Sequence, residues 1–89
     1  MDGIFNMIVT PAYKIGDMVN YLAYLSDSGK EILSSGIVID MEEKMDNKAS
    51  HGALSILYTI RNGITGSLYY RFQSQIEPSN YQKFMNKYM

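Results

Sequence analysis

Three consecutive β-branched residues, Ile37, Val38 and Ile39, lie near the middle of the chain. Such side chains are restricted at χ1 and pack better on a pleated sheet than on a helix. A short apolar run that begins after a glycine and ends at a charged residue is typical of a buried strand. We therefore predict a central strand that ends near Met41, with a bulge or a sharp bend at Gly36.

Strand signals also occur on both sides of this run. Residues 18–25 are apolar apart from one asparagine, and residues 53–61 and 67–72 alternate between apolar and polar side chains. The Asn62-Gly63 dipeptide favours a hairpin between the last two segments, and a brief final strand is expected around Ile76. The chain is therefore predicted to be mainly β, a small barrel of about five strands.

Alternation along the predicted hairpin assigns its two faces. The residues expected to face the interior are Leu54, Ile56, Tyr58, Ile60, Leu68, Tyr70 and Phe72. Because successive side chains of a strand point to opposite faces, Tyr69 and Arg71 are expected to point outward. Their neighbours across the ladder are then expected to be Thr59 and Arg61.

In residues 18–25 both faces carry apolar groups, so the pattern does not say which face is buried.

The remaining segments are interpreted from their composition. Residues 1–12 are expected to form an N-terminal arm or an added strand, residues 13–78 the barrel, and residues 30–35 either a strand or a helical turn. The mixed charges of residues 41–52 are typical of a solvated loop.

A capping-box pattern that begins at Ser79 predicts a short helix over residues 79–89. Its apolar stripe consists of Tyr81, Phe84, Met85 and Tyr88. Because so short a helix is marginal alone, the stripe is expected to pack on the barrel, or to bind a partner or a second copy of the chain.

Composition narrows the function classes. With 89 residues and no cysteine, the chain is expected to be one domain without disulfides or a thiolate metal site. No apolar run approaches the roughly 20 residues that span a bilayer, and no secretion-signal pattern is present, so we expect a cytoplasmic protein that does not bind membranes. His51 is the only histidine, and no nucleophile, phosphate-loop or metal-ligand spacing occurs. We therefore expect no enzymatic activity, no cofactor and no metal.

Three fragments stand out for their order and spacing. They are Tyr13-Lys14-Ile15-Gly16-Asp17-Met18-Val19, Ser35-Gly36-Ile37-Val38 and Gln73-Ser74-Gln75-Ile76-Glu77-Pro78. Over residues 13–78 they resemble the Src-homology-three-like small barrels, in the broad bacterial and phage usage of that name. In that family G-D-x-V opens the first strand, G-x-V begins the second and I-x-P closes the barrel. The small size and the content of Tyr, Met, Asn and Lys also resemble phage-encoded accessory proteins.

The resemblance implies a barrel that binds peptide, protein or nucleic acid, and it does not imply an enzyme. The proline-peptide groove of eukaryotic members needs an aromatic set that includes tryptophan, and this chain has none.

Tyrosine beside arginine on the outward hairpin face predicts a binding surface, because these two residue types dominate protein interfaces. The candidate residues are Tyr69, Arg71, Arg61, Thr59 and Tyr24. The first hypothesis is a protein-interaction module, in one form a phage-borne adaptor or inhibitor of a host complex. The alternatives are a nucleic-acid-binding barrel that also uses Lys14 or Lys30, or a structural subunit of a larger assembly, including a homodimer. Equally, these cross-strand pairs can serve only to stabilise the sheet.

Overall fold

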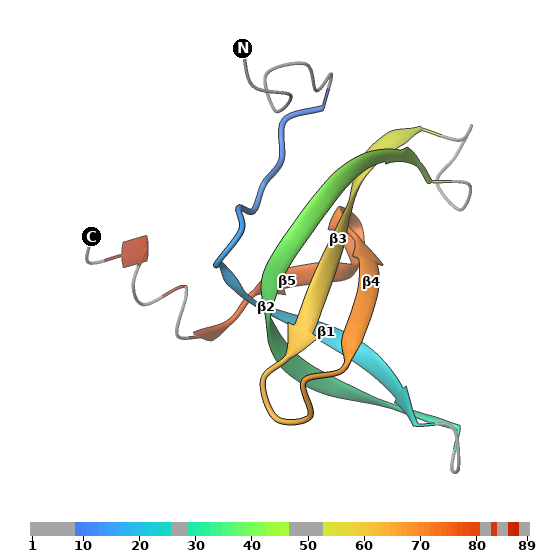
Figure 1. Cartoon of the computed structure of the whole chain (residues 1–89), viewed down its shortest axis with the longest axis vertical. Helices are drawn as coiled ribbons and strands as arrows, with labels where there is room; N and C mark the ends of the chain where they lie inside the picture. Colours follow the sequence, from blue (N-terminus) through green and yellow to red (C-terminus); the bar gives the residue numbers. More distant parts are fainter. Residues whose placement is uncertain (1–8, 26–28, 47–52, 81–82, 84–85, 88–89) are drawn as a thin grey trace.

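The computed structural model describes residues 9–25, 29–46, 53–80, 83, 86 and 87. Five strands form one antiparallel sheet in the order β4-β3-β2-β1-β5 (Figure 1). The elements are β1 (Met18–Leu25), β2 (Lys30–Met45), β3 (Leu54–Asn62), β4 (Leu68–Phe72), the short 3₁₀ helix η2 (Gln73–Gln75) and β5 (Ile76–Pro78). The mainly β prediction is therefore confirmed.

Strand β2 is the longest element and joins the two parts of the sheet. Its first half, from Lys30 to Ile37, pairs with β1, and its second half pairs with β3 up to Met45. Figure 1 shows that β2 curves strongly along its length, so the two halves run in different directions. The alternative of a helical turn at residues 30–35 is wrong, because these residues pair with β1 throughout.

The predicted end of the strand near Met41 is also wrong, because β2 continues to Met45; residues 47–52 of the predicted loop lie outside the described residues. The strand continues because its two faces differ in environment. Glu42 and Lys44 lie on the exposed face, whereas Met41 packs against the core. Glu43 is half-buried, and its Oε2 accepts a 2.7 Å hydrogen bond from the backbone N–H of Val9. An antiparallel sheet tolerates charged residues where one face is solvated.

One face of the sheet holds the core. Its buried apolar residues are Val19, Tyr21, Ala23, Val38, Ile56, Tyr58, Ile60 and Ile76. The buried face of β1 is thus the one that carries Tyr21. The interior positions predicted in β3 are confirmed for Ile56, Tyr58 and Ile60, but Leu54, at the start of the strand, is 40% exposed.

The bulge in β2 lies at Ile39, because the register against β3 shifts between Val38 and Asp40. Of the two alternatives predicted at Gly36, a bulge or a sharp bend, the bulge is therefore wrong. Gly36 is buried where β3 approaches closely: a Cβ atom there would overlap the backbone of Arg61 and lie 2.7 Å from Cγ2 of Ile60. The glycine is thus needed for strand packing.

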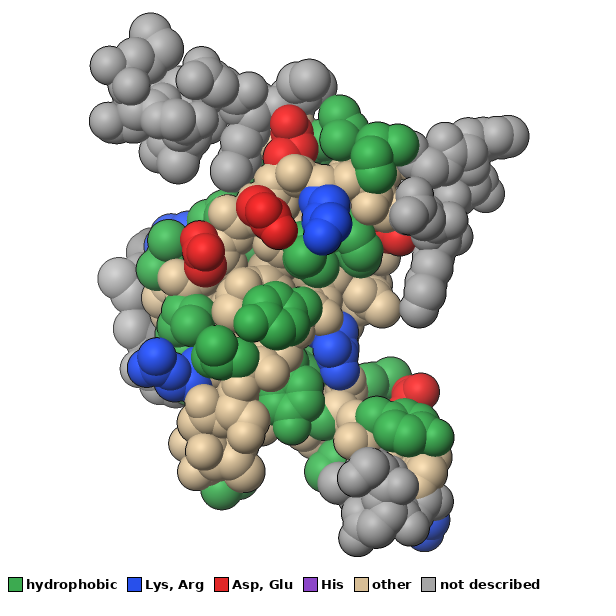
Figure 2. Space-filling model, turned by 45° about the vertical axis from the view of Figure 1, so that its right-hand side comes forward, with side chains coloured by type: hydrophobic (Ala, Val, Ile, Leu, Met, Phe, Trp, Pro, Cys, Tyr) green, Lys and Arg blue, Asp and Glu red, His purple; other side chains and the backbone are tan. Residues whose placement is uncertain are grey.

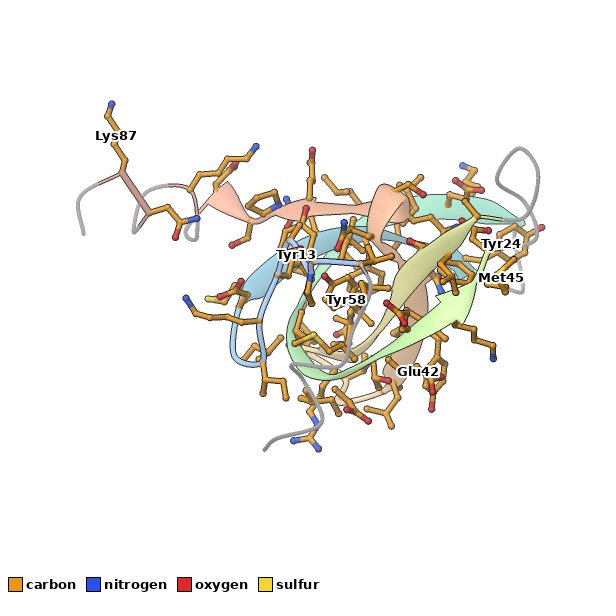
Figure 3. The ribbon with its side chains drawn as sticks, turned by 90° about the horizontal axis from the view of Figure 1, so that it is seen from above. Tyr13, Tyr24, Glu42, Met45, Tyr58 and Lys87 are labelled. Carbon is orange, nitrogen blue, oxygen red and sulfur yellow. The ribbon has the colours of Figure 1, made fainter. Side chains whose placement is uncertain are left out.

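Tyr13 and Tyr58 anchor the described part of the N-terminal segment to the sheet (Figure 3). The backbone N–H of Tyr13 donates to the Tyr58 hydroxyl at 3.2 Å, and that hydroxyl donates to Oε1 of Gln73 at 2.6 Å. The same Oε1 accepts from the N–H of Ala12 at 2.9 Å, and the Tyr13 hydroxyl donates to the carbonyl of Ile76 at 3.1 Å. Residues 9–12 are therefore a docked arm without strand structure.

Burial makes the stability of this region sensitive to alkaline pH. Desolvation raises the pKa of Tyr13, Tyr21 and Tyr58 above the ordinary value. A tyrosine in the unfolded chain ionises near pH 10, so above that pH the unfolded chain loses protons that the folded state retains. We expect the free energy of unfolding to be unaffected by these groups below about pH 10 and to fall as the pH rises further. Urea unfolding across this range, with tyrosinate absorbance, measures the effect; a constant free energy above pH 10 would contradict it.

Helical backbone is described at four positions near the C-terminus, namely Asn80, Lys83, Asn86 and Lys87. The backbone N–H of Lys83 donates to the carbonyl of Ser79 at 2.9 Å, as in a first helical turn. The predicted stripe of Tyr81, Phe84, Met85 and Tyr88 lies outside the described residues.

Candidate functional site

The register of the β3–β4 hairpin reverses the predicted faces of β4. Tyr69 pairs with Ile60 and Arg71 with Tyr58, so both side chains share the core side of the sheet. The prediction that Tyr69 and Arg71 point outward beside Thr59 and Arg61 is therefore wrong. Instead, Leu68 and Tyr70, which were expected inside, are 46% and 57% exposed.

The length of the hairpin loop explains this reversal. Asn62 donates its backbone N–H to the carbonyl of Ser67 at 2.8 Å, so the four residues 63–66 form the connection. Oδ1 of Asn62 accepts from the backbone N–H groups of Ile64 and Thr65, and Gly66 has the positive φ of 76°. An even number of loop residues places Arg61 opposite Leu68, whereas the predicted pairing requires an odd number. Asn62 and Gly63 therefore lie at the start of this connection, which is longer than a two-residue turn.

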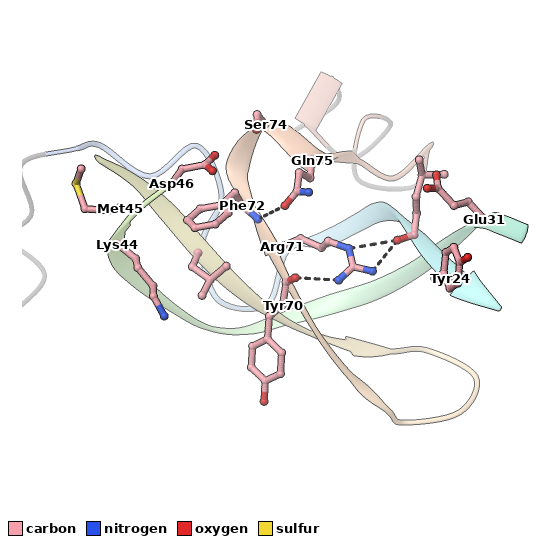
Figure 4. Close-up of a pocket in the computed structure, with 12 residues that line it drawn as sticks. Tyr24, Glu31, Lys44, Met45, Asp46, Tyr70, Arg71, Phe72, Ser74 and Gln75 are labelled. Atoms are coloured by element: carbon pink, nitrogen blue, oxygen red, sulfur yellow. Dashed lines mark hydrogen bonds between the residues drawn. The ribbon is translucent and has the colours of Figure 1, made fainter. Parts of the chain in front are cut away.

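Arg71 connects β4 to β1, two strands that are not neighbours in the sheet. Its Nε and Nη2 donate to the carbonyl of Leu22 at 3.2 Å and 2.8 Å, and its Nη1 donates to the carbonyl of Tyr70 at 2.8 Å (Figure 4). The guanidinium carbon lies 5.5 Å from the ring centroid of Tyr69 and 5.8 Å from that of Tyr21. These distances are within the range of cation–π interactions.

A cleft of about 790 Å³ lies around the Arg71 side chain, between the edge of β4 and the end of β1 that carries Leu22 and Tyr24. It is lined by Leu22, Tyr24, Glu31, Lys44, Met45, Asp46, Leu57, Tyr70, Arg71, Phe72, Ser74 and Gln75. In Figure 4, Arg71 lies between one end formed by Tyr24 and Glu31 and another formed by Lys44 and Asp46. The cleft therefore combines apolar and aromatic walls with charged groups of both signs.

The 3₁₀ helix η2 forms the wall beside β4. Oε1 of Gln75 accepts the backbone N–H of Phe72 at 2.8 Å (Figure 4). This bond satisfies an N–H group at the edge of the sheet and fixes the turn that leads from β4 to β5.

Seen from above, Tyr24 and Met45 lie at the same end of the molecule, away from Tyr13 (Figure 3).

The structure brings together only part of the predicted surface. Tyr24 and Arg71 line the cleft, and Tyr69 lies beneath the guanidinium. Thr59 and Arg61 lie on the face of the hairpin that carries Leu68 and Tyr70, opposite to the face of Tyr69 and Arg71. Neither Thr59 nor Arg61 lines the cleft. The charge of Lys14 lies at the other end of β1, where its Nζ is 3.9 Å from Oδ1 of Asp17.

Lys44, Met45 and Asp46, at the end of β2, also line the cleft, but they were expected in a loop and so were not predicted as site residues. Phe72 lines the cleft too, although the alternation predicted it in the interior. The apolar side chains on the second face of residues 18–25 were the available signal, since Leu22 lies on that face and lines the cleft.

Within residues 9–25, 29–46, 53–80, 83, 86 and 87, no group of three His, Cys, Asp or Glu side chains is placed to hold a metal ion. His51 lies outside this part of the chain. In the same described residues, no helix has the length and apolar character needed to cross a membrane.

Figure 2 shows one face of the molecule, where apolar side chains lie among charged groups of both signs. Comparison of the chain with protein-family models, curated proteins and solved structures finds no match in any of the three. The residues of the cleft are therefore what indicates a function.

Proposed function

We propose that this protein is a small, non-enzymatic binding module that recognises a protein partner through the cleft between β1 and β4. The observation that carries the proposal is the cleft itself. Its volume of about 790 Å³ is within the usual range of ligand sites. Tyr24 and Tyr70 at its walls are 64% and 57% exposed, and exposed tyrosines next to an arginine are typical of protein-interface hot spots.

We propose further that the sheet is the curled sheet of a Src-homology-three-like barrel. The consecutive order of β1 to β4, the return of β5 to β1, and η2 before β5 support this assignment. The Arg71 bridge supports it too, because it draws β4 toward β1. The motif residues Gly16 and Asp17 lie directly before β1 and bond to Val38. The N–H of Gly16 donates to the carbonyl of Val38 at 2.8 Å, and the N–H of Val38 donates to the carbonyl of Asp17 at 2.9 Å.

The proposed function predicts that Tyr24→Ala and Tyr70→Ala weaken partner binding without unfolding the protein. Removal of an interface tyrosine costs about 2 kcal/mol of binding free energy, whereas both side chains are exposed and contribute little to the core. Peptides selected from a displayed random library against the wild-type chain should bind each variant about tenfold or more weakly in titration calorimetry. Ile64→Ala is the matched control, because Ile64 is 96% exposed in the hairpin loop and does not line the cleft. Selected peptides that bind all variants equally would place recognition elsewhere.

A second candidate function is binding of single-stranded nucleic acid, because the cleft combines Arg71 and Lys44 with two exposed tyrosines. Glu31 and Asp46 line the same cleft, which disfavours a run of phosphates. A salt-sensitive shift with oligonucleotides at low ionic strength would favour this candidate over a protein partner.

A further inference from the structure

The charge of Arg71 has no anionic partner among the described residues. The side chain is half-buried, and its hydrogen bonds are all to the carbonyl oxygens of Leu22 and Tyr70. Carbonyl oxygens and the ring faces of Tyr21 and Tyr69 stabilise a cation but do not neutralise it. The guanidinium can therefore still pair with an anion that enters the cleft from solvent.

Part of the guanidinium remains available to a ligand. Nε, Nη1 and Nη2 each make a bond to a carbonyl, and each Nη nitrogen has a second N–H. Glu31, a carboxylate that lines the cleft, makes no hydrogen bond or ion pair with Arg71. The bonds to Leu22 and Tyr70 hold the fork in place, so an incoming carboxylate would meet a pre-oriented donor pair.

The shape of the cleft distinguishes between sources of a carboxylate. Arg71 lies in the middle of the cleft, and lining residues continue past it on both sides, toward Tyr24 and toward Lys44 (Figure 4). A chain terminus would favour an anion site at a closed end. An arginine at the centre instead suits a side chain of a segment that runs through.

We propose that the cleft binds an extended peptide segment through an acidic side chain, glutamate or aspartate, which pairs with Arg71. The apolar neighbours of that acidic residue contact Leu22, Tyr70 and Phe72. This inference rests on the proposed function and assigns its specificity: the module prefers acidic over neutral or basic segments.

The test compares short blocked peptides on the ¹⁵N-labelled full chain by NMR. The probes are acetyl-Leu-Glu-Leu-amide, its neutral analogue acetyl-Leu-Gln-Leu-amide, and the basic acetyl-Leu-Lys-Leu-amide. We expect the Glu peptide to shift the Nε–H signal of Arg71 and the amide signals of Tyr70, and to bind about tenfold more tightly than the Gln peptide. The advantage should shrink with added salt.

Two variants locate the effect. In Arg71→Gln, which keeps an N–H donor for the Leu22 carbonyl but removes the charge, the preference for Glu over Gln should disappear. Lys44→Gln makes the same change of net charge at an exposed residue of the same cleft and should keep most of the preference. If Arg71→Gln does not fold, the comparison of the three peptides on the wild-type chain still decides.

Several outcomes would overturn the inference. The first group concerns the blocked peptides: equal binding of the Glu and Gln peptides, tighter binding of the Lys peptide than of the Glu peptide, or no shift at the cleft with any peptide. The second group concerns other ligands: acetyl-Leu-Gln-Leu with a free C-terminus, or a dT oligonucleotide that shifts the same signals, would bind more tightly than the Glu peptide. Equal binding at the cleft would leave the proposed function intact. No binding at the cleft, together with an unsuccessful peptide selection, would remove the proposed function as well.

Discussion

Replacement of Gly36 by alanine is expected to lower the free energy of unfolding by about 3 kcal/mol, because the new Cβ atom overpacks the centre of the sheet. It would overlap the backbone of Arg61 and lie 2.7 Å from Cγ2 of Ile60. The strand cannot move away freely, since Gly36 pairs with Val19 of β1 on one side and with Asn62 of β3 on the other. The φ of Gly36 is not in the positive region, so an alanine would otherwise favour the strand.

Gly63→Ala is the matched control for this substitution. Gly63 also lacks a positive φ, and the nearest atom to a Cβ there is the carbonyl oxygen of Ser35 at 3.7 Å, which is ordinary contact. Its expected effect is within about 0.5 kcal/mol. Urea unfolding followed by circular dichroism compares the two variants. An equal, small effect of both would mean that β2 and β3 are farther apart at Gly36 than the structure has them.

The second large effect is expected for Tyr58→Phe, with a loss of about 2 kcal/mol. Tyr58 is fully buried, and its hydroxyl accepts from the N–H of Tyr13 and donates to Gln73. Phenylalanine keeps the packing of the ring against Tyr13, whose ring centroid is 5.4 Å away. It has no hydroxyl, however, to accept from the N–H of Tyr13 or to donate to Gln73. The loss therefore comes mainly from the part-buried N–H of Tyr13, which is no longer paired, whereas Oε1 of Gln73 keeps its bond from the N–H of Ala12.

Tyr70→Phe serves as the control for Tyr58→Phe, because Tyr70 is 57% exposed and water can replace any bond of its hydroxyl. Its expected effect is within about 0.5 kcal/mol. Chemical denaturation gives the two free energies, and native-state hydrogen exchange should show faster exchange at the amides of Ala12 and Tyr13 in Tyr58→Phe only. Unchanged exchange at these amides would mean that the arm is held by other contacts.

The parts of the fold that were predicted correctly follow from strict local alternation. In β3, Ile56, Tyr58 and Ile60 alternate with polar or partly exposed neighbours, and the buried face follows directly. In β1 both faces are apolar because Leu22 and Tyr24 line a cleft rather than face only water. Local periodicity cannot separate a core face from a cleft wall.

The errors arose where a distant contact decides the outcome. β2 continues to Met45 because residues 41–45 pair with residues 54–58 of β3, and half-buried Glu43 also accepts the N–H of Val9, which lies far away in the sequence. The faces of β4 depend on whether the loop has an even or an odd number of residues, a small difference in chain length that the residue pattern does not resolve. The candidate site could be predicted only in part, since it forms between strand ends that meet through the curvature of β2.

The side-chain bonds at the two outer strands also bear on how easily the margins of the sheet could pair with another strand. An unpaired strand edge can add strands from other molecules and start aggregation. Here the guanidinium of Arg71 covers the carbonyl of Tyr70, Gln75 covers the N–H of Phe72, and the Tyr13 hydroxyl covers the carbonyl of Ile76. Pro78 at the other margin has no N–H to offer. A growing fibril would have to break these bonds before it could use either margin as a template.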